Sequence, residues 1–67
     1  MIFLSVNGKP VELSDSISIM DFLLSYKIKP DTVVIELNYD IPERQSWSDI
    51  QLINGDKLEI VKFIGGG

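Results

Sequence analysis

One stretch of the 67-residue sequence repeats its apolar residues with the period of a helix, whereas the other apolar stretches alternate. In "SISIMDFLLSYKIKPD" the apolar side chains recur at i, i+3, i+4 and i+7, at Ile19, Phe22, Leu23 and Tyr26. This spacing predicts an amphipathic helix from about Ile19 to about Lys27. A small domain with one such helix buries the apolar stripe by laying the helix on one face of a sheet. The pattern therefore favours an α+β fold.

The residues at both ends of the predicted helix are typical of helix termini. Ser18 suits the N-cap, because its hydroxyl can accept a hydrogen bond from a free backbone N–H. Asp21, at the third helical position, favours the positive end of the helix dipole. Lys27 and Lys29 fall near the C-terminal end, and Pro30 lies beyond it.

The first fourteen residues predict a β-hairpin. In "MIFLSV" the residues Ile2, Leu4 and Val6 share one face, in "PVELS" Val11 and Leu13 share one face, and between the two segments stands Asn7-Gly8. Both turn residues tolerate positive φ, which a two-residue hairpin turn requires.

The rest of the chain predicts two clear strands with a broken segment between them. "TVVIELN" alternates, and "KLEIVKFI" gives a last strand from Leu58 to Ile64. Between them Pro42 disfavours a central strand position. We expect a brief edge strand near Ile41 and a turn of helix near Trp47 to Ile50.

Together these elements predict an α+β roll: a mixed sheet of four to five strands with one helix packed on one face. One domain, residues 1–64, is followed by a flexible glycine tail, residues 65–67. Trp47 is expected to cover an edge of the core. The sheet residues expected beneath the helix are Ile2, Leu4, Val6, Val11, Leu13, Val33, Ile35, Leu37, Leu58 and Ile60.

Composition argues against several function classes. The chain has no Cys and no His, so the common catalytic triads and thiolate or imidazole metal sites cannot form. Its net charge of −4 and the lack of a basic stripe argue against nucleic-acid binding. No apolar run is long enough to span a membrane, and the absence of a signal peptide favours the cytoplasm. The acid pair Asp40/Glu43 is expected on a wet surface, so we do not expect an enzyme.

The reactive group that remains is the α-carboxylate of Gly67, at the end of "KFIGGG". A carboxylate can attack the α-phosphate of ATP when an enzyme supplies Mg²⁺ and positions both reactants. Glycine lacks a Cβ, so Gly65, Gly66 and Gly67 can thread a narrow channel, and three extended residues reach about 10 Å. A frayed terminus or a cloning remnant is the alternative explanation of these glycines.

The order of elements and the Gly-Gly end resemble the ubiquitin-like β-grasp arrangement. Within it the whole chain resembles the ThiS family of sulfur carriers in thiamine biosynthesis. The likeness rests on "VNGKPVEL", "SIMDFL", "VVIELN" followed by "IPERQSW", and "NGDKLEIVKFIGGG". Gly66 and Gly67 match the family's terminal Gly-Gly pair, and Gly65 is an extra glycine before that pair.

This resemblance implies a carrier rather than a catalyst. A ThiF-like adenylating enzyme would activate the Gly67 carboxylate with ATP and Mg²⁺, and this chain would bind no cofactor itself. Sulfur from a cysteine persulfide would convert the carboxylate to a thiocarboxylate. The thiocarboxylate would give its sulfur to a ThiG-like thiazole synthase.

Three alternatives remain at this point. The small subunit of molybdopterin synthase shares the fold, the tail and the activation chemistry, but it is usually longer. A β-grasp interaction module would bind a partner without being activated. A protein modifier would be joined to lysines as ubiquitin is.

The strand pattern also predicts a docking face for the activating enzyme. Val61 and Phe63 alternate with the inward Leu58 and Ile60, so they should point away from the helix. Phe3 and Val34 share this outward direction in their own strands. In a β-grasp sheet the last strand lies between those two strands. The four residues, Phe3, Val34, Val61 and Phe63, are therefore expected to meet on one surface beside the tail.

Overall fold

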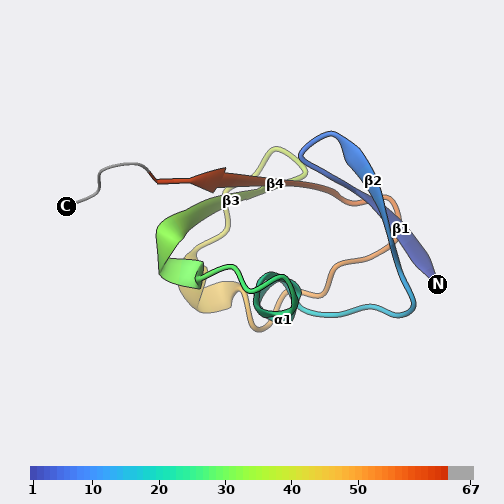
Figure 1. Ribbon diagram of the computed structural model, residues 1–67, viewed down its shortest axis with the longest axis horizontal. Coiled ribbons are helices and arrows are strands. Elements are labelled where there is room, and N and C mark those ends of the chain that lie inside the picture. Colours follow the sequence, from blue (N-terminus) through green and yellow to red (C-terminus); the bar gives the residue numbers. More distant parts are fainter. Residues whose placement is uncertain (64–67) are drawn as a thin grey trace.

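The computed structural model describes residues 1–63, which form one sheet with a helix packed beneath it (Figure 1). The sheet has four strands in the order β2-β1-β4-β3. The elements in chain order are β1 (Ile2–Val6), β2 (Lys9–Leu13), α1 (Ile19–Ser25), the 3₁₀ turn η1 (Pro30–Thr32), β3 (Val33–Leu37), the 3₁₀ turn η2 (Arg44–Ser46) and β4 (Lys57–Lys62).

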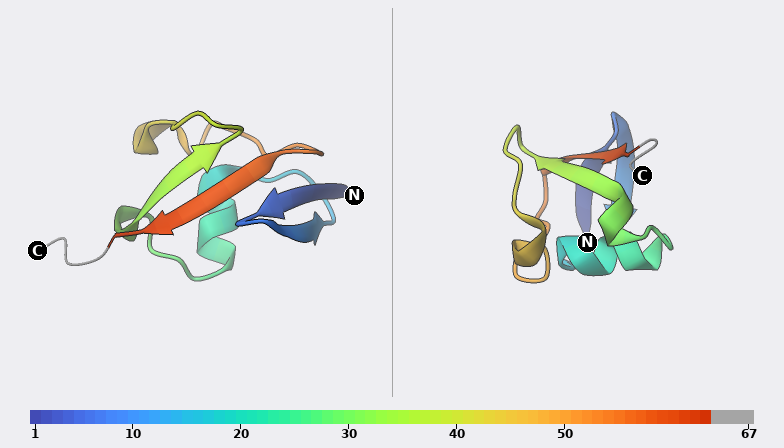
Figure 2. Two further views of the ribbon diagram at one scale, coloured as in Figure 1. Left: turned by 90° about the horizontal axis from the view of Figure 1, so that it is seen from above. Right: turned by 90° about the vertical axis from the view of Figure 1, so that its left-hand side faces the viewer.

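The sheet is mixed, as the sequence predicts. Strand β1 runs antiparallel to β2 and parallel to β4, and β3 runs antiparallel to β4. The first and last strands therefore lie side by side in the centre, as Figure 2 shows from above. Helix α1 lies across one face only, so the other face of the sheet is left free of helices.

The N-terminal hairpin is confirmed. Asn7 and Gly8 have φ angles of 51° and 81°, the left-handed values of a type I′ turn. The two-residue loop fixes the register, so that Val6 faces Lys9 and Leu4 faces Val11. This register turns Leu4 into the core, where it is buried.

Helix α1 begins as predicted, with the Ser18 hydroxyl accepting a 3.0 Å hydrogen bond from the Asp21 N–H. It ends at Ser25, earlier than predicted, because Lys27 adopts a left-handed conformation with φ of 60°. The N–H groups of Ile28 and Lys27 then bond to the carbonyls of Leu23 and Leu24, at 2.9 and 3.0 Å. This is a Schellman ending.

The Schellman ending also corrects the predicted apolar stripe. Tyr26 is the C-cap residue, one position before the left-handed Lys27, and 55% of it is exposed. The Tyr26 ring still packs on Phe22, with ring centroids 4.8 Å apart. The stripe that is buried consists of Ile19, Phe22 and Leu23.

The core lies between α1 and the inner face of the sheet, and Trp47 is part of it. The indole is only 2% exposed, and its Nε1 donates a 3.2 Å hydrogen bond to the Pro42 carbonyl. The turn of helix expected at Trp47 lies slightly earlier, as η2. All ten predicted sheet residues are buried in the core or packed against it.

The predicted edge strand near Ile41 is wrong. Leu37 and Asp40 form a single bridge across a tight turn, in which Asn38 and Tyr39 have φ of 51° and 73°. The next hydrogen bond of such a ladder would need an N–H from Pro42, which has none. Ile41 is 68% exposed, so the sheet keeps four strands.

Candidate functional site around the end of β4

The predicted site residues Gly65, Gly66 and Gly67 lie outside the described residues, as does Ile64. The structure instead describes the support from which the chain continues toward them. The backbone N–H of Phe63 donates a 2.9 Å hydrogen bond to the carbonyl of Thr32, just after β4 ends. On the other side of β4, the Ile60 N–H donates to the side chain of Asn7 at 2.7 Å. The end of β4 is therefore held on one side by the hairpin turn and on the other by the residue that precedes β3.

Three of the four predicted docking residues gather on the outer face of this end. Val34 and Val61 are direct partners across β3 and β4. Phe63 follows Val61 with the same outward direction, and these two side chains are 50% and 58% exposed, respectively. We call Val34, Val61 and Phe63 the apolar patch.

Phe3 does not join the apolar patch, so the prediction that all four residues meet is wrong. Strand β1 pairs with β4 through Ser5 opposite Lys57, and the Phe3 carbonyl accepts a 2.8 Å hydrogen bond from the Gly55 N–H. Phe3 therefore lies level with Gly55, just before β4 begins, six residues or about 20 Å along the chain from Val61. Phe3 is exposed, but at the opposite end of the sheet.

Charged side chains separate Phe3 from the apolar patch. Glu36 and Glu59 are direct cross-strand partners on the outer face. Beside them the Lys57 ammonium donates a 2.9 Å hydrogen bond to the Tyr39 hydroxyl and lies 4.6 Å from the centre of that ring. The hydrogen bond to Tyr39, with smaller attractions to Glu59 and Glu36, raises the pKa of Lys57. A charged row therefore borders the apolar patch.

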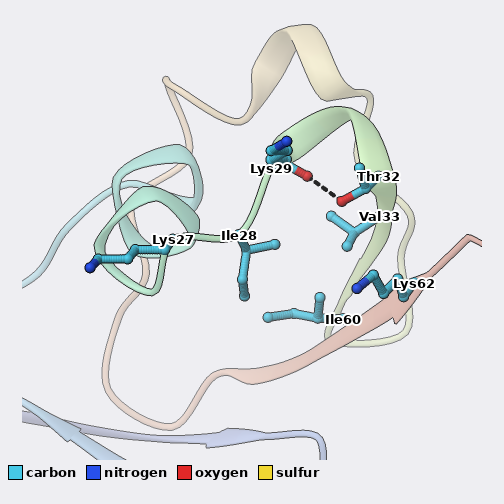
Figure 3. Close-up of a pocket in the computed structure, with 7 residues that line it drawn as sticks. All are labelled: Lys27, Ile28, Lys29, Thr32, Val33, Ile60 and Lys62. Carbon is cyan, nitrogen blue, oxygen red and sulfur yellow. Dashed lines mark hydrogen bonds between the residues drawn. The ribbon is translucent and has the colours of Figure 1, made fainter.

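The inner side of the same strand end holds a feature that the sequence pattern did not reveal. A cleft of about 490 Å³ opens between the segment after α1 and the ends of β3 and β4 (Figure 3). It is lined by Lys27, Ile28, Lys29, Thr32, Val33, Ile60 and Lys62. We call it the lysine cleft. The spacing of Lys27 and Lys29 indicated only a helix end, because the cleft that they line together with Lys62 depends on the Schellman turn.

Two further features of the described residues are their acidic side chains and the length of their helices. Within residues 1–63, no group of three or more Asp or Glu side chains is placed to hold a metal ion. Asp40 and Glu43 are both exposed, as expected of a solvated pair. No helix in that range has the length and hydropathy needed to span a bilayer.

Comparison with known proteins places this architecture in one family. The ThiS family model matches residues 4–67. The sulfur carrier protein ThiS of Bacillus subtilis (strain 168) is 37% identical over 65 residues, covering 96% of this chain and 98% of that protein. A crystal structure of the thiamine biosynthesis protein ThiS from Geobacter metallireducens superimposes with a TM-score of 0.86 at 32% identity, covering 98% of this chain and all of that one.

Another relative is an enzyme, and only one segment of it is similar to this chain. The thiazole synthase of Paramagnetospirillum magneticum is 36% identical over 64 residues, which are 96% of this chain but only 20% of that protein. That enzyme thus includes a segment similar to nearly all of this chain. The family match, the Bacillus relative and the shared mixed sheet agree, and the chain belongs to the ThiS family.

Proposed function

We propose that this chain carries sulfur for thiamine biosynthesis as a thiocarboxylate on Gly67. The observation that carries the proposal is the family match, which extends through Gly67 and covers almost the whole chain. The sulfur carrier ThiS of Bacillus subtilis matches over nearly its full length, which favours the same role over the molybdopterin synthase subunit or a module that is never activated.

The proposed chemistry takes place on the Gly67 carboxylate inside partner enzymes. A carboxylate oxygen attacks the α-phosphorus of ATP, pyrophosphate leaves, and an acyl-adenylate forms. A persulfide sulfur then attacks the acyl carbon and AMP leaves. A second thiol cleaves the resulting S–S bond and leaves the thiocarboxylate. The adenylating enzyme supplies ATP and Mg²⁺, so this chain acts as a co-substrate and not as a catalyst.

In this proposal residues 1–63 bind the partner enzyme and hold the strand from which the tail continues. In this proposal the apolar patch seats the adenylating enzyme, because exposed apolar side chains grouped on one surface often mark an interface. The hydrogen bonds from Ile60 to Asn7 and from Phe63 to Thr32 hold the strand from which the tail departs. A partner on the patch would therefore meet the tail at a fixed starting point.

Thiazole synthase is the proposed acceptor of the sulfur. Two thiazole synthases each contain a segment similar to more than nine-tenths of this chain, at 36% and 29% identity. A carrier-like segment on the same polypeptide as the enzyme favours a working partnership between the two.

The test is reconstitution with purified partners. The chain, a ThiF-like enzyme, ATP, Mg²⁺, a persulfide donor and a thiol are incubated, and thiazole synthase with its other substrates is added. We expect thiazole formation that depends on the chain and is lost on deletion of Gly66 and Gly67. Loaded chain that supports molybdopterin formation but no thiazole formation would overturn the proposed pathway.

A further inference from the structure

The lysine cleft combines an apolar floor with a basic rim. Figure 3 shows the aliphatic side chains of Ile28, Val33 and Ile60 turned toward one space, with Lys62 reaching over it from β4. Val33 is buried, whereas Ile28 and Ile60 are only partly buried at the border of the core. An apolar surface that stays open beside the core is suited to receive a side chain from outside.

The rim concentrates positive charge in an acidic protein. Three of the chain's six basic side chains, Lys27, Lys29 and Lys62, line this one cleft, although the net charge is −4. All three are exposed. In the described part of the chain, Lys57 is the only lysine whose ammonium donates a hydrogen bond. All three lysines therefore present their charge to solvent, where a partner's carboxylates can meet it. Figure 3 shows the Lys27 side chain extending away from the apolar floor, so Lys29 and Lys62 are the lysines that we test.

The cleft and the apolar patch lie on opposite faces of one strand end. Ile60 and Lys62 point to the inner face of β4, while Val61 and Phe63 point to the outer face. An enzyme seated on the patch leaves the lysine cleft uncovered. Both surfaces adjoin the point where the chain continues toward Gly67.

We propose that the lysine cleft docks thiazole synthase, through a segment that carries one large apolar side chain flanked by carboxylates. The inference rests on the proposed function, which assigns the patch to the adenylating enzyme and the loaded tail to thiazole synthase. The apolar side chain packs on Ile28, Val33 and Ile60, and the carboxylates face the lysines. Separate docking surfaces allow the two enzymes to use the same tail in turn.

The experiment measures the affinity of the sulfur-free chain for thiazole synthase by calorimetry at two salt concentrations. Lys29→Glu and Lys62→Glu are each expected to weaken binding by about five- to tenfold and to reduce its salt dependence. Lys62→Arg is expected to keep the wild-type affinity. Lys9→Glu makes the same charge change on the distant hairpin, and we expect its affinity to stay within about twofold of wild type.

Wild-type affinity for both cleft variants would overturn the proposal, and so would an equal loss in Lys9→Glu. Two other occupants are tested by NMR of the Ile28 and Ile60 methyl groups without enzyme. Shifts on deletion of residues 65–67 would assign the cleft to the chain's own tail, and shifts with pyrophosphate alone would assign it to a free anion. Either result would contradict enzyme docking.

Sulfur loading is measured on the same samples, so that the two proposals fail separately. If the chain never gains sulfur but its binding to thiazole synthase depends on the lysines, the carrier function is refuted and the docking site stands. If the chain gains sulfur and the lysine variants still bind thiazole synthase with wild-type affinity, the carrier function stands and the docking site is refuted.

Discussion

The side-chain oxygen of Asn7 accepts a 2.7 Å hydrogen bond from the backbone N–H of Ile60, joining the hairpin turn to the last strand. Regular pairing between β1 and β4 covers only Ser5 with Lys57 and Val6 with Leu58. The Asn7 side chain thus supports β4 beyond the end of β1. Asn7 has two functions here, since its backbone also forms the left-handed turn.

Replacing Asn7 with Gly separates these functions. Asn7→Gly keeps a residue that tolerates positive φ but removes the acceptor for the Ile60 N–H. We expect the free energy of unfolding to fall by about 1 kcal/mol. Amide exchange at Ile60 should become faster than at Leu58. Lys9→Ala on the same hairpin serves as the control, with a change within about 0.5 kcal/mol. Unchanged stability and exchange in Asn7→Gly would show that this bond contributes nothing.

Trp47 is expected to be essential for stability. Its indole fills the core and donates a hydrogen bond to Pro42. Trp47→Ala should cost about 3–5 kcal/mol, which is enough to unfold a large fraction of so small a domain. Urea titration measures the loss, and Trp47→Phe should retain part of the stability. A Trp47→Ala protein of wild-type stability that fails to bind partners would assign Trp47 to recognition instead.

The opposed glutamates on the outer face should destabilise the sheet slightly. Glu36 and Glu59 are direct partners, and like charges in this position repel. Lys57 is attracted more to Glu59 than to Glu36, so Glu36 is the better choice for removal. Glu36→Gln should raise the free energy of unfolding by about 0.2–1 kcal/mol at low salt. The gain should shrink in high salt, and a loss of stability at low salt would contradict this account.

Local sequence signals predicted the elements whose ends are set by their own residues. Asn7-Gly8 fixed the hairpin through positive φ, and Ser18 marked the start of α1 through its hydroxyl. The edge strand near Ile41 failed because one missing N–H, that of Pro42, stops the ladder after a single bridge.

Features set by distant parts of the chain were not predictable in the same way. Alternation gave the outward direction of Phe3, but the register between β1 and β4 decides how far Phe3 lies from Val61. That register is held by contacts such as the bond from the Gly55 N–H to the Phe3 carbonyl. The lysine cleft likewise needs the turn at Lys27, where a residue other than Gly adopts a left-handed conformation.

The position of Phe3 supplies a matched control for the apolar patch. Phe63→Asp places a charge where the activating enzyme is proposed to dock, and adenylation should be greatly weakened. Because Phe63 is half exposed, stability should change by no more than about 1 kcal/mol. Phe3→Asp makes the same change at a similarly exposed site at the other end of the sheet, and adenylation should stay near wild type. Equal adenylation rates in both variants would show that the patch is not the docking face.

The central claim is that sulfur is carried on Gly67, and intact mass spectrometry with fragmentation tests it most directly. After incubation with the adenylating enzyme, ATP, Mg²⁺, a persulfide donor and a thiol, the chain should gain the mass of one oxygen-to-sulfur exchange. Fragmentation should place that gain at the carboxyl group of Gly67, and a chain lacking Gly66 and Gly67 should gain nothing while keeping its circular dichroism spectrum. Sulfur acquired by the truncated chain, or located elsewhere in the full chain, would contradict the account.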